Sequence, residues 1–358
     1  MIDWKKREAD AHRTMNELAK QNRLLNDRER MGKKTELKSL PTILQVELSA
    51  DCNLTCSICA RNEFPYGPGS LPIDLFDTLT FLFPSLEKLI LHGYGEPMAH
   101  PGFQTIMGRV AGFACHTSFY TNGTLLFGDR ARAVLTGDVD EIAVSIDSPD
   151  PKKFEDIRTG ASFRRVTDNV KKFIEARNEK GMETPRIVVA AVAMKETVDD
   201  LVDLTRFVAD LGADAIEVNY LMAYKEELVS RSLFFDQERA NRALEEVKRH
   251  ADELGLEARL PEPFTLGGMK SPGTQEMSCL RVYDFAYIGY DGNVRPCCFP
   301  LLYLGNIAEE GFLDIWNNKA YRKLRKSFAD NKPPSFCMEC LSGTYTDVDS
   351  RKCHISCE

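Results

Sequence analysis

Residues 46–59 read VELSADCNLTCSIC, in which Cys52, Cys56 and Cys59 follow the end of an apolar run. Three thiolates within eight residues of one loop can converge on a single metal centre. If that centre is a four-iron cluster, one iron keeps no protein ligand, as a catalytic site requires. The spacing therefore predicts an open metal or iron–sulfur site, and its place after a strand is where α/β folds carry their chemistry.

The bulk composition is that of an ordinary globular protein, with 43% hydrophobic and 28% charged residues in 358. Its net charge of -8 argues against binding to nucleic acid or to anionic membranes, which needs a basic face. No apolar run approaches the ~20 residues that span a bilayer, and the first residues lack a signal-peptide core. We therefore expect a cytoplasmic protein, in which eleven cysteines indicate metal ligation rather than disulfides.

Short apolar runs alternate with amphipathic stretches from Thr42 onward, which predicts an α/β fold. The runs expected to form strands are 43–48, 88–91, 117–120, 141–146, 187–193 and 215–218. The stretches expected to form helices are 73–83, 102–111, 163–180, 198–211 and 236–255. Six such alternations imply parallel strands joined by right-handed crossovers. Both an open sheet and a barrel satisfy this pattern.

A breaker-rich stretch from Pro261 to Gly273 predicts a domain boundary. Beyond it, a hairpin is expected over 282–296 with its turn at Asp291-Gly292, followed by one helix near 313–328. We expect three regions: a polar helical extension over 1–40 that packs loosely, a core over 41–260, and a cysteine-rich domain over 261–358.

The C-x3-C-x2-C spacing resembles that of the radical S-adenosylmethionine (SAM) superfamily, and further similarities follow in the same order along the chain. His92-Gly93-Tyr94-Gly95-Glu96-Pro97 resembles the family's glycine-glycine-glutamate motif, with Tyr94 in place of the first glycine. The resemblance implies a partial (β/α)6 TIM-like barrel as the fold of the core. It also implies SAM contacts, which it places at Ile58, Gly95, Glu96, Thr121, Asn122, Ser145 and Arg158. Ile58 stands where many members carry an aromatic residue near the adenine, and Arg158 matches an arginine that pairs with the SAM carboxylate.

The later cysteines resemble the SPASM/twitch extension, a small hairpin-plus-helix domain that binds auxiliary iron–sulfur clusters. The resemblance implies that one auxiliary [4Fe–4S] cluster is held by Cys279, Cys297, Cys337 and Cys340. Cys298 neighbours Cys297 on a strand and should face the opposite side. A second auxiliary site at Cys353 and Cys357 remains an alternative, although we favour one cluster.

The chemistry implied by the resemblance is reductive cleavage of SAM to a 5′-deoxyadenosyl radical, which abstracts a substrate hydrogen. An auxiliary cluster favours an oxidative outcome on a small metabolite or natural-product precursor, with flavodoxin or ferredoxin as reductant. A maturase acting on a peptide or protein is the alternative, and a structural zinc module is a remote one. Possible substrate contacts at the end of the sixth strand are Glu217, Asn219, Tyr220 and Tyr224. No general base is named, and His92 is expected to have a structural role.

Overall fold

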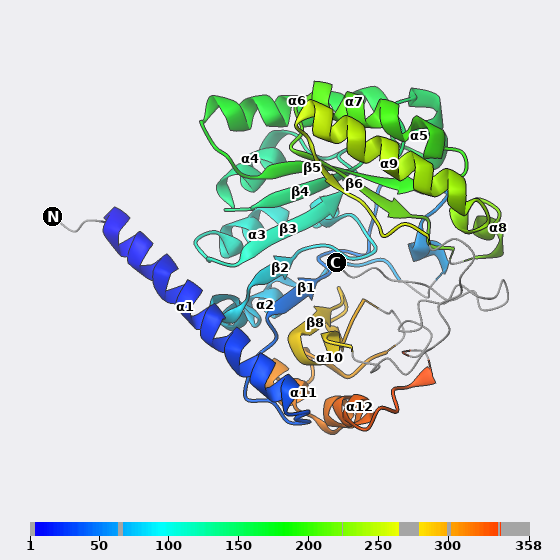
Figure 1. Ribbon diagram of the computed structural model, residues 1–358. Helices are drawn as coiled ribbons and strands as arrows, with labels where there is room; N and C mark the ends of the chain where they lie inside the picture. The colour runs from blue at the N-terminus through cyan, green and yellow to red at the C-terminus, as the bar shows by residue number, and fades with distance from the viewer. Residues whose placement is uncertain are drawn as a thin grey trace.

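The computed structural model describes residues 4–63, 67–223, 225–264, 279–298, 302–335 and 337, with side chains from residue 14 onward and without that of Asn62 (Figure 1). The described strands are β1 Ile43–Val46, β2 Lys88–Ile90, β3 His116–Thr121, β4 Glu141–Ser145, β5 Arg186–Ala193, β6 Ala215–Tyr220, β7 Glu257–Arg259, β8 Phe285–Ile288, β9 Asn293–Arg295 and β10 Gly305–Asn306. The α-helices are α1 Trp4–Met31, α2 Ile73–Asp77, α3 Phe103–Val110, α4 Gly128–Thr136, α5 Pro151–Ile157, α6 Phe163–Glu179, α7 Leu201–Leu211, α8 Glu226–Val229, α9 Gln237–Leu254, α10 Arg281–Asp284, α11 Phe312–Trp316 and α12 Lys319–Ala329. Short 3-10 helices are η1 Ala60–Glu63, η2 Thr80–Ser85, η3 Pro97–Ala99, η4 Val198–Asp200 and η5 Leu233–Phe235.

The strands form one sheet in the order β10-β9-β8-β1-β2-β3-β4-β5-β6-β7. All neighbours from β8 through β1 to β7 are parallel, whereas β9 and β10 add antiparallel pairs at one edge. The predicted partial barrel is confirmed, and its six expected strands are β1 to β6. The sequence did not predict β7, nor that β8 would continue the barrel sheet by pairing with β1.

The connecting helices lie along one face of this curved sheet (Figure 1). Alternate strand residues point toward them and are fully buried, among them Leu89, Ile142, Val189 and Ile216 at 0% exposure. The side chains between those residues face the interior of the barrel, because neighbours along a strand point to opposite faces. Within the described residues, no helix is long and apolar enough to cross a membrane.

Helix α1 is one continuous helix whose first turns extend away from the rest of the chain (Figure 1). Its last turns are held firmly, so the expectation of loose packing is wrong there. Asn26 is 1% exposed and donates to Ser39 Oγ at 3.1 Å and to the Tyr283 carbonyl at 2.6 Å. Buried amides are kept only when they are hydrogen-bonded, so α1 ties the barrel to the β8 region.

The region after β8 packs around the indole of Trp316, which donates to the Ser39 carbonyl at 2.9 Å. Arg325 is fully buried, lies 4.4 Å over that ring, and donates to the Val282 carbonyl at 3.0 Å. The single helix expected near 313–328 is two helices, α11 and α12. Asn318 separates them because its side chain accepts from the Tyr321 amide at 2.9 Å and caps α12.

Candidate functional site

The loop after β1 carries Cys52, Cys56 and Cys59, all half-buried. It lies at the carboxyl edge of the parallel strands. The Thr55 amide donates to the Thr159 carbonyl at 3.0 Å, and the Ser57 amide donates to the Ile157 carbonyl at 2.9 Å. The loop is therefore pinned to the end of α5, which fixes where its three thiols lie.

Burial raises the pKa of the Cys52 and Cys56 thiols, so the thiolates need positive charge or metal to balance them. Arg61 is close enough to Cys52 to oppose that rise. Its Nη1 donates to the Ala50 carbonyl at 2.9 Å, while its Nε is buried without a partner among the described residues. The Nε–H group of Arg61 is therefore available to donate a hydrogen bond to a cysteine or cluster sulfur.

Nowhere in the described ranges do three His, Cys, Asp or Glu side chains approach closely enough to hold a single metal ion. A four-iron cluster binds each cysteine through a separate iron atom, so its cysteine sulfurs lie farther apart than the ligands of a single metal ion. The three half-buried thiols and the unpartnered Nε of Arg61 fit such a cluster.

The segment from Gly93 to Glu96 lies against the end of β1 so closely that its glycines have no room for a side chain. A Cβ on Gly93 would meet Glu47 Cγ at 2.4 Å, and one on Gly95 would meet the Ser49 carbonyl oxygen at 2.1 Å. Tyr94, which replaces a glycine of the family motif, donates its hydroxyl to the Cys298 carbonyl at 3.1 Å. Tyr94 thus links this motif to the second cysteine group.

Glu96 holds the ends of two strands together beside the cysteine loop. Its carboxylate accepts from Thr121 Oγ1 at 2.7 Å, from the Asn122 amide at 2.8 Å and from the Met98 amide at 3.2 Å. Burial raises the pKa of Glu96 to about 6. The Asn122 side chain lies 3.8 Å from Cys52 Sγ. Three predicted SAM contacts, Glu96, Thr121 and Asn122, therefore come together, with Glu96 engaged by protein donors.

Arg158 is paired with Asp147, a partner that the sequence did not suggest. Nε and Nη2 of the arginine donate to the two Asp147 oxygens at 2.6 and 3.0 Å. Asp147 is 0% exposed and also accepts from the Val192 amide at 3.0 Å. Burial alone would lower the pKa of Arg158, but Asp147 and Cys56 outweigh it and raise that pKa. Ser145 lies at the end of β4, half-buried, opposite Ala190 of β5.

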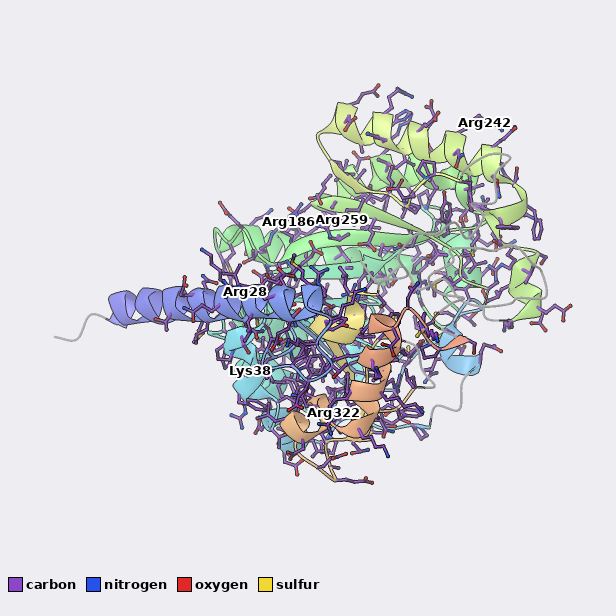
Figure 2. All side chains as sticks on the ribbon, turned by 60° about the horizontal axis from the view of Figure 1, so that its bottom comes forward. Arg28, Lys38, Arg186, Arg242, Arg259 and Arg322 are labelled. Atoms are coloured by element: carbon purple, nitrogen blue, oxygen red, sulfur yellow. The ribbon has the colours of Figure 1, made fainter. Side chains whose placement is uncertain are left out.

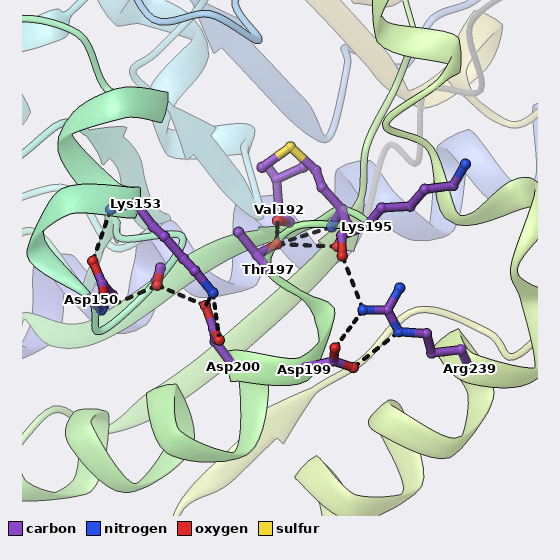
Figure 3. A network of polar contacts seen from close by, with 10 residues as sticks. Asp150, Lys153, Val192, Lys195, Thr197, Asp199, Asp200 and Arg239 are labelled. Atoms are coloured by element: carbon purple, nitrogen blue, oxygen red, sulfur yellow. Dashed lines mark hydrogen bonds and ion pairs between the residues drawn. The ribbon is translucent and has the colours of Figure 1, made fainter.

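A network of polar contacts fixes the turn after β5 (Figure 3). Thr197 Oγ1 donates to the Val192 carbonyl at 3.2 Å and accepts from the Met194 amide at 3.1 Å. Lys153 on α5 pairs with Asp200 at 2.7 Å. Together these contacts hold the carboxyl end of β5 against α5, and with it the position of Val192.

A cavity of about 600 Å³ occupies the interior of the barrel. Its wall includes Ile58 of the cysteine loop and Cys298 of the second cysteine group. Three of the four predicted substrate contacts line it: Glu217, Asn219 and Tyr220. Tyr224 lies outside the described residues. The remaining lining residues are Gln45, Lys88, Ile90, His92, Ser118, Phe119, Tyr120, Glu141, Ala143, Val192, Val218, Leu221, Met222, Arg259, Leu260, Pro261, Arg281 and Phe285.

A hydrogen-bonded cluster centred on Glu217 lies in this cavity. Tyr120 donates its hydroxyl to Glu217 Oε1 at 2.5 Å, and Asn219 Nδ2 donates to the same oxygen at 2.7 Å. Burial raises the pKa of Tyr120, and Glu217 adds to that rise, so the phenol keeps its proton. Sequence reasoning missed Tyr120, although its inward position follows from strand alternation.

His92 is neutral in this cavity and touches Tyr120. Burial lowers the pKa of His92 to about 3. Its ring packs edge to face against that of Tyr120, with 4.7 Å between the ring centroids. The Tyr120 amide donates to His92 Nδ1 at 3.2 Å, which leaves the ring proton on Nε2. His92 thus has the expected structural role, since it accepts the hydrogen bond of the Tyr120 amide, and it also forms part of the cavity wall.

Of the second cysteine group, the structure describes Cys279, Cys297, Cys298 and Cys337, all half-buried. Cys340, Cys353 and Cys357 lie outside the described residues. Cys298 lines the cavity, whereas Cys297 is close enough to Tyr321 of α12 to affect its pKa. The prediction that Cys297 and Cys298 lie on a strand is wrong, because β9 ends at Arg295 and both cysteines lie in the bend that follows it. Their different surroundings are set by this bend and not by strand alternation.

Comparison with known proteins gives two family matches. The radical SAM superfamily matches residues 46–208, and the SPASM family, an iron-sulfur cluster-binding domain, matches residues 279–341. The chain is 29% identical to a tungsten-containing aldehyde ferredoxin oxidoreductase cofactor-modifying protein of Pyrococcus furiosus, over 83% of this chain and 86% of that one. It is 23% identical to an AdoMet-dependent heme synthase of Oleidesulfovibrio alaskensis, over 77% and 74% of the two chains. The structure of Streptococcus suis SuiB bound to precursor peptide SuiA shares the fold, with a TM-score of 0.63 at 18% identity over 83% of this chain and 69% of that one.

Proposed function

Because the chain belongs to the radical SAM superfamily and carries a SPASM domain, we propose that it oxidatively modifies a small metabolite or cofactor-like molecule inside the barrel. With its clusters and SAM bound, such a site supplies a 5′-deoxyadenosyl radical that abstracts a hydrogen atom from the substrate. The protein's own task is to hold the substrate beside that radical, to exclude water and to accept the proton that is released.

We assign the SAM-binding cluster to Cys52, Cys56 and Cys59, which share one pinned and half-buried loop. The SAM contacts in this proposal are Ile58, Gly95, Glu96, Thr121, Asn122, Ser145 and Arg158. Glu96 acts chiefly by fixing Asn122 and Thr121, since its oxygens accept protein hydrogen bonds. Arg158 presents the N–H groups that Asp147 leaves unused.

We assign one auxiliary cluster to Cys279, Cys297, Cys337 and Cys340. All four cysteines fall within the SPASM match at residues 279–341, while Cys353 and Cys357 fall beyond it. This distribution supports a single auxiliary cluster over two. Flavodoxin or ferredoxin in the reducing cytosol is the electron donor that we propose for both clusters.

The observation that carries the proposal is the cavity of about 600 Å³, whose wall reaches both cysteine groups and carries charged and polar side chains among apolar ones. Barrels of this type normally fill their interior with aliphatic side chains. A cavity of this size suits a small molecule, and buried polar groups without a ligand would only cost stability. Ile58 and Cys298 place the cavity wall beside both proposed clusters.

Glu217 is the group that we propose as proton acceptor. The other cavity carboxylate, Glu141, is held at both oxygens by Arg259 at 2.7 Å. Among the described residues, the partners of Glu217 are the neutral groups Tyr120 and Asn219, which orient it and leave its charge available. Its Oε2 is the atom at which the substrate proton would be held.

The relatives support a small substrate: one is named for modifying a cofactor and another for making heme. A peptide or protein side chain is the second candidate. It is favoured by the cavity lining at Pro261, Arg281 and Phe285, since these residues lie near the two strands, β7 and β8, between which the barrel is not closed. SuiB, which shares the fold, is seen bound to a precursor peptide.

The test is SAM cleavage by anaerobically reconstituted protein reduced with dithionite. The wild type should form 5′-deoxyadenosine, and Cys56→Ala should abolish its formation. Cys115→Ala is the matched control, because Cys115 is a buried cysteine outside both groups. Colourless protein that contains only zinc, or equal cleavage by Cys56→Ala, would contradict the proposal.

A further inference from the structure

Lys88 is a cation in the barrel interior to which the proposed function assigns no role. It is the first residue of β2, and its half-buried side chain lines the cavity. Ile90 and His92, which follow at alternate positions, line the same cavity. Lys88 therefore points inward, at the end of the barrel opposite the cysteine loop.

Four other charged groups of this region are paired with one another, namely Arg259, Glu141, Glu257 and Arg186, while Arg281 stacks on the ring of Phe285. Arg259 holds Glu141 at both oxygens and donates its Nε to Glu257 at 2.7 Å. Arg186 also binds Glu257, and both arginines are labelled in Figure 2. Lys88, by contrast, makes no side-chain hydrogen bond or ion pair with any described residue, although it is near enough to Glu141 and His92 to influence their pKa values.

A half-buried ammonium that no described residue pairs with is available to a ligand that brings negative charge to it. Neutral donors line the same cavity farther along the barrel. Ser118, opposite Ile90 on β3, places a hydroxyl in the cavity wall, and the His92 ring carries its proton on Nε2. A lysine with neutral donors in the same cavity is an arrangement that can bind phosphate or carboxylate oxygens.

The distance along the barrel sets the shape of such a ligand. His92 is four positions after Lys88, which corresponds to about 13 Å of extended chain. The cysteine loop and Ile58 lie at the far end. We infer that Lys88 binds an anionic oxygen group, a phosphate or a carboxylate, at the end of an elongated substrate that is remote from the reacting carbon. This inference rests on the proposed function only in placing the substrate in this cavity.

Inorganic pyrophosphate and glutarate are the probes, each titrated calorimetrically into anaerobic, cluster-containing protein. The wild type should bind at least one of them, and the probe that binds identifies the anion as phosphate or carboxylate. Lys88→Gln should weaken that binding roughly ten- to hundredfold, the worth of one charge-assisted hydrogen bond. Lys88→Arg should keep most of the affinity, and Lys248→Gln, on the exposed face of α9, should keep all of it.

Two readouts separate this inference from the proposed function. The bound probe should slow acylation of Lys88 in wild-type protein, followed by peptide mass spectrometry. SAM cleavage without substrate should be unchanged in Lys88→Gln, because Lys88 is remote from the cysteine loop. Absence of binding by both probes, or equal affinity in Lys88→Gln, would overturn the anion site and leave the SAM-cleavage test unaffected.

Discussion

Gly95→Ala is the substitution to which the site should be most sensitive. The added methyl group would lie 2.1 Å from the Ser49 carbonyl oxygen, 2.7 Å from the Ala50 carbonyl carbon and 2.8 Å from the Asp51 carbonyl oxygen. All three are backbone atoms of the segment that leads into Cys52. No side-chain rotation can relieve the overlap, so the two segments must separate.

Ordinary contact begins at 3.4 Å, so the closest pair must move apart by about 1.3 Å. Overpacking against a rigid neighbour typically costs about 1–3 kcal/mol, and contact with backbone favours the upper end. The hydrogen bond from the Glu96 amide to the Asp51 carbonyl, 2.8 Å long, would be strained by the same movement. We therefore expect a loss of about 3 kcal/mol together with a displaced Cys52.

Urea unfolding of the metal-free protein measures the loss of stability, and iron and sulfide content after reconstitution measures the damage to the cluster loop. Gly108→Ala is the matched control, because nothing lies within 4 Å of the added methyl. It should stabilise α3 by up to about 1 kcal/mol, since glycine is unfavourable inside a helix. Gly95→Ala protein with wild-type stability and iron content would refute the reasoning.

Four further predictions follow from the same contacts. Asp147→Asn should cost about 3–5 kcal/mol in urea unfolding, because it leaves the Arg158 charge buried without its partner; a loss below 1 kcal/mol would contradict this. Burial raises the pKa of Glu96 to about 6 from 4.5, so the folded state binds that proton more tightly than the unfolded state does. Stability should therefore fall by about 2 kcal/mol as pH rises from about 4.5 to 6, and Glu96→Gln should flatten this dependence. Glu217→Gln should keep 5′-deoxyadenosine formation while product formation drops by about 10²-fold or more, the usual share of a general base; equal product yield would exclude Glu217 as proton acceptor. Cys353→Ala/Cys357→Ala protein should keep about eight irons per chain, as two four-iron clusters require; a loss of iron would favour a second auxiliary site.

The parts of the fold that could be predicted are those in which local pattern and final structure agree. Strands β1 to β6 are buried on the helix-facing side, so they appear in the sequence as apolar runs. Strand β7 has the sequence Glu-Ala-Arg and is stabilised by ion pairs with Glu141 and Arg186, which no local pattern reveals. Helix α5 was missed because it is short, although Asp150 and Pro151 are typical of a helix start.

The same distinction applies to the site. The spacing of Cys52, Cys56 and Cys59 is local and could be found without a structure. The contacts inside the cavity join distant segments: Tyr120 and Glu217 are 97 residues apart, and Lys88 comes near Glu141 only inside the barrel. Alternation along β6 placed Glu217 and Asn219 inward, but it could not tell what they would bind.

The central claim is that the loop of Cys52, Cys56 and Cys59 holds the cluster to which SAM binds. The electron paramagnetic resonance spectrum of the reduced protein, recorded with and without SAM, tests it directly. SAM should change the spectrum of the wild type and of Cys279→Ala/Cys297→Ala, which keeps the first site intact. The change should be absent in Cys56→Ala. A wild-type spectrum that SAM leaves unaltered, or a full response in Cys56→Ala, would contradict the claim.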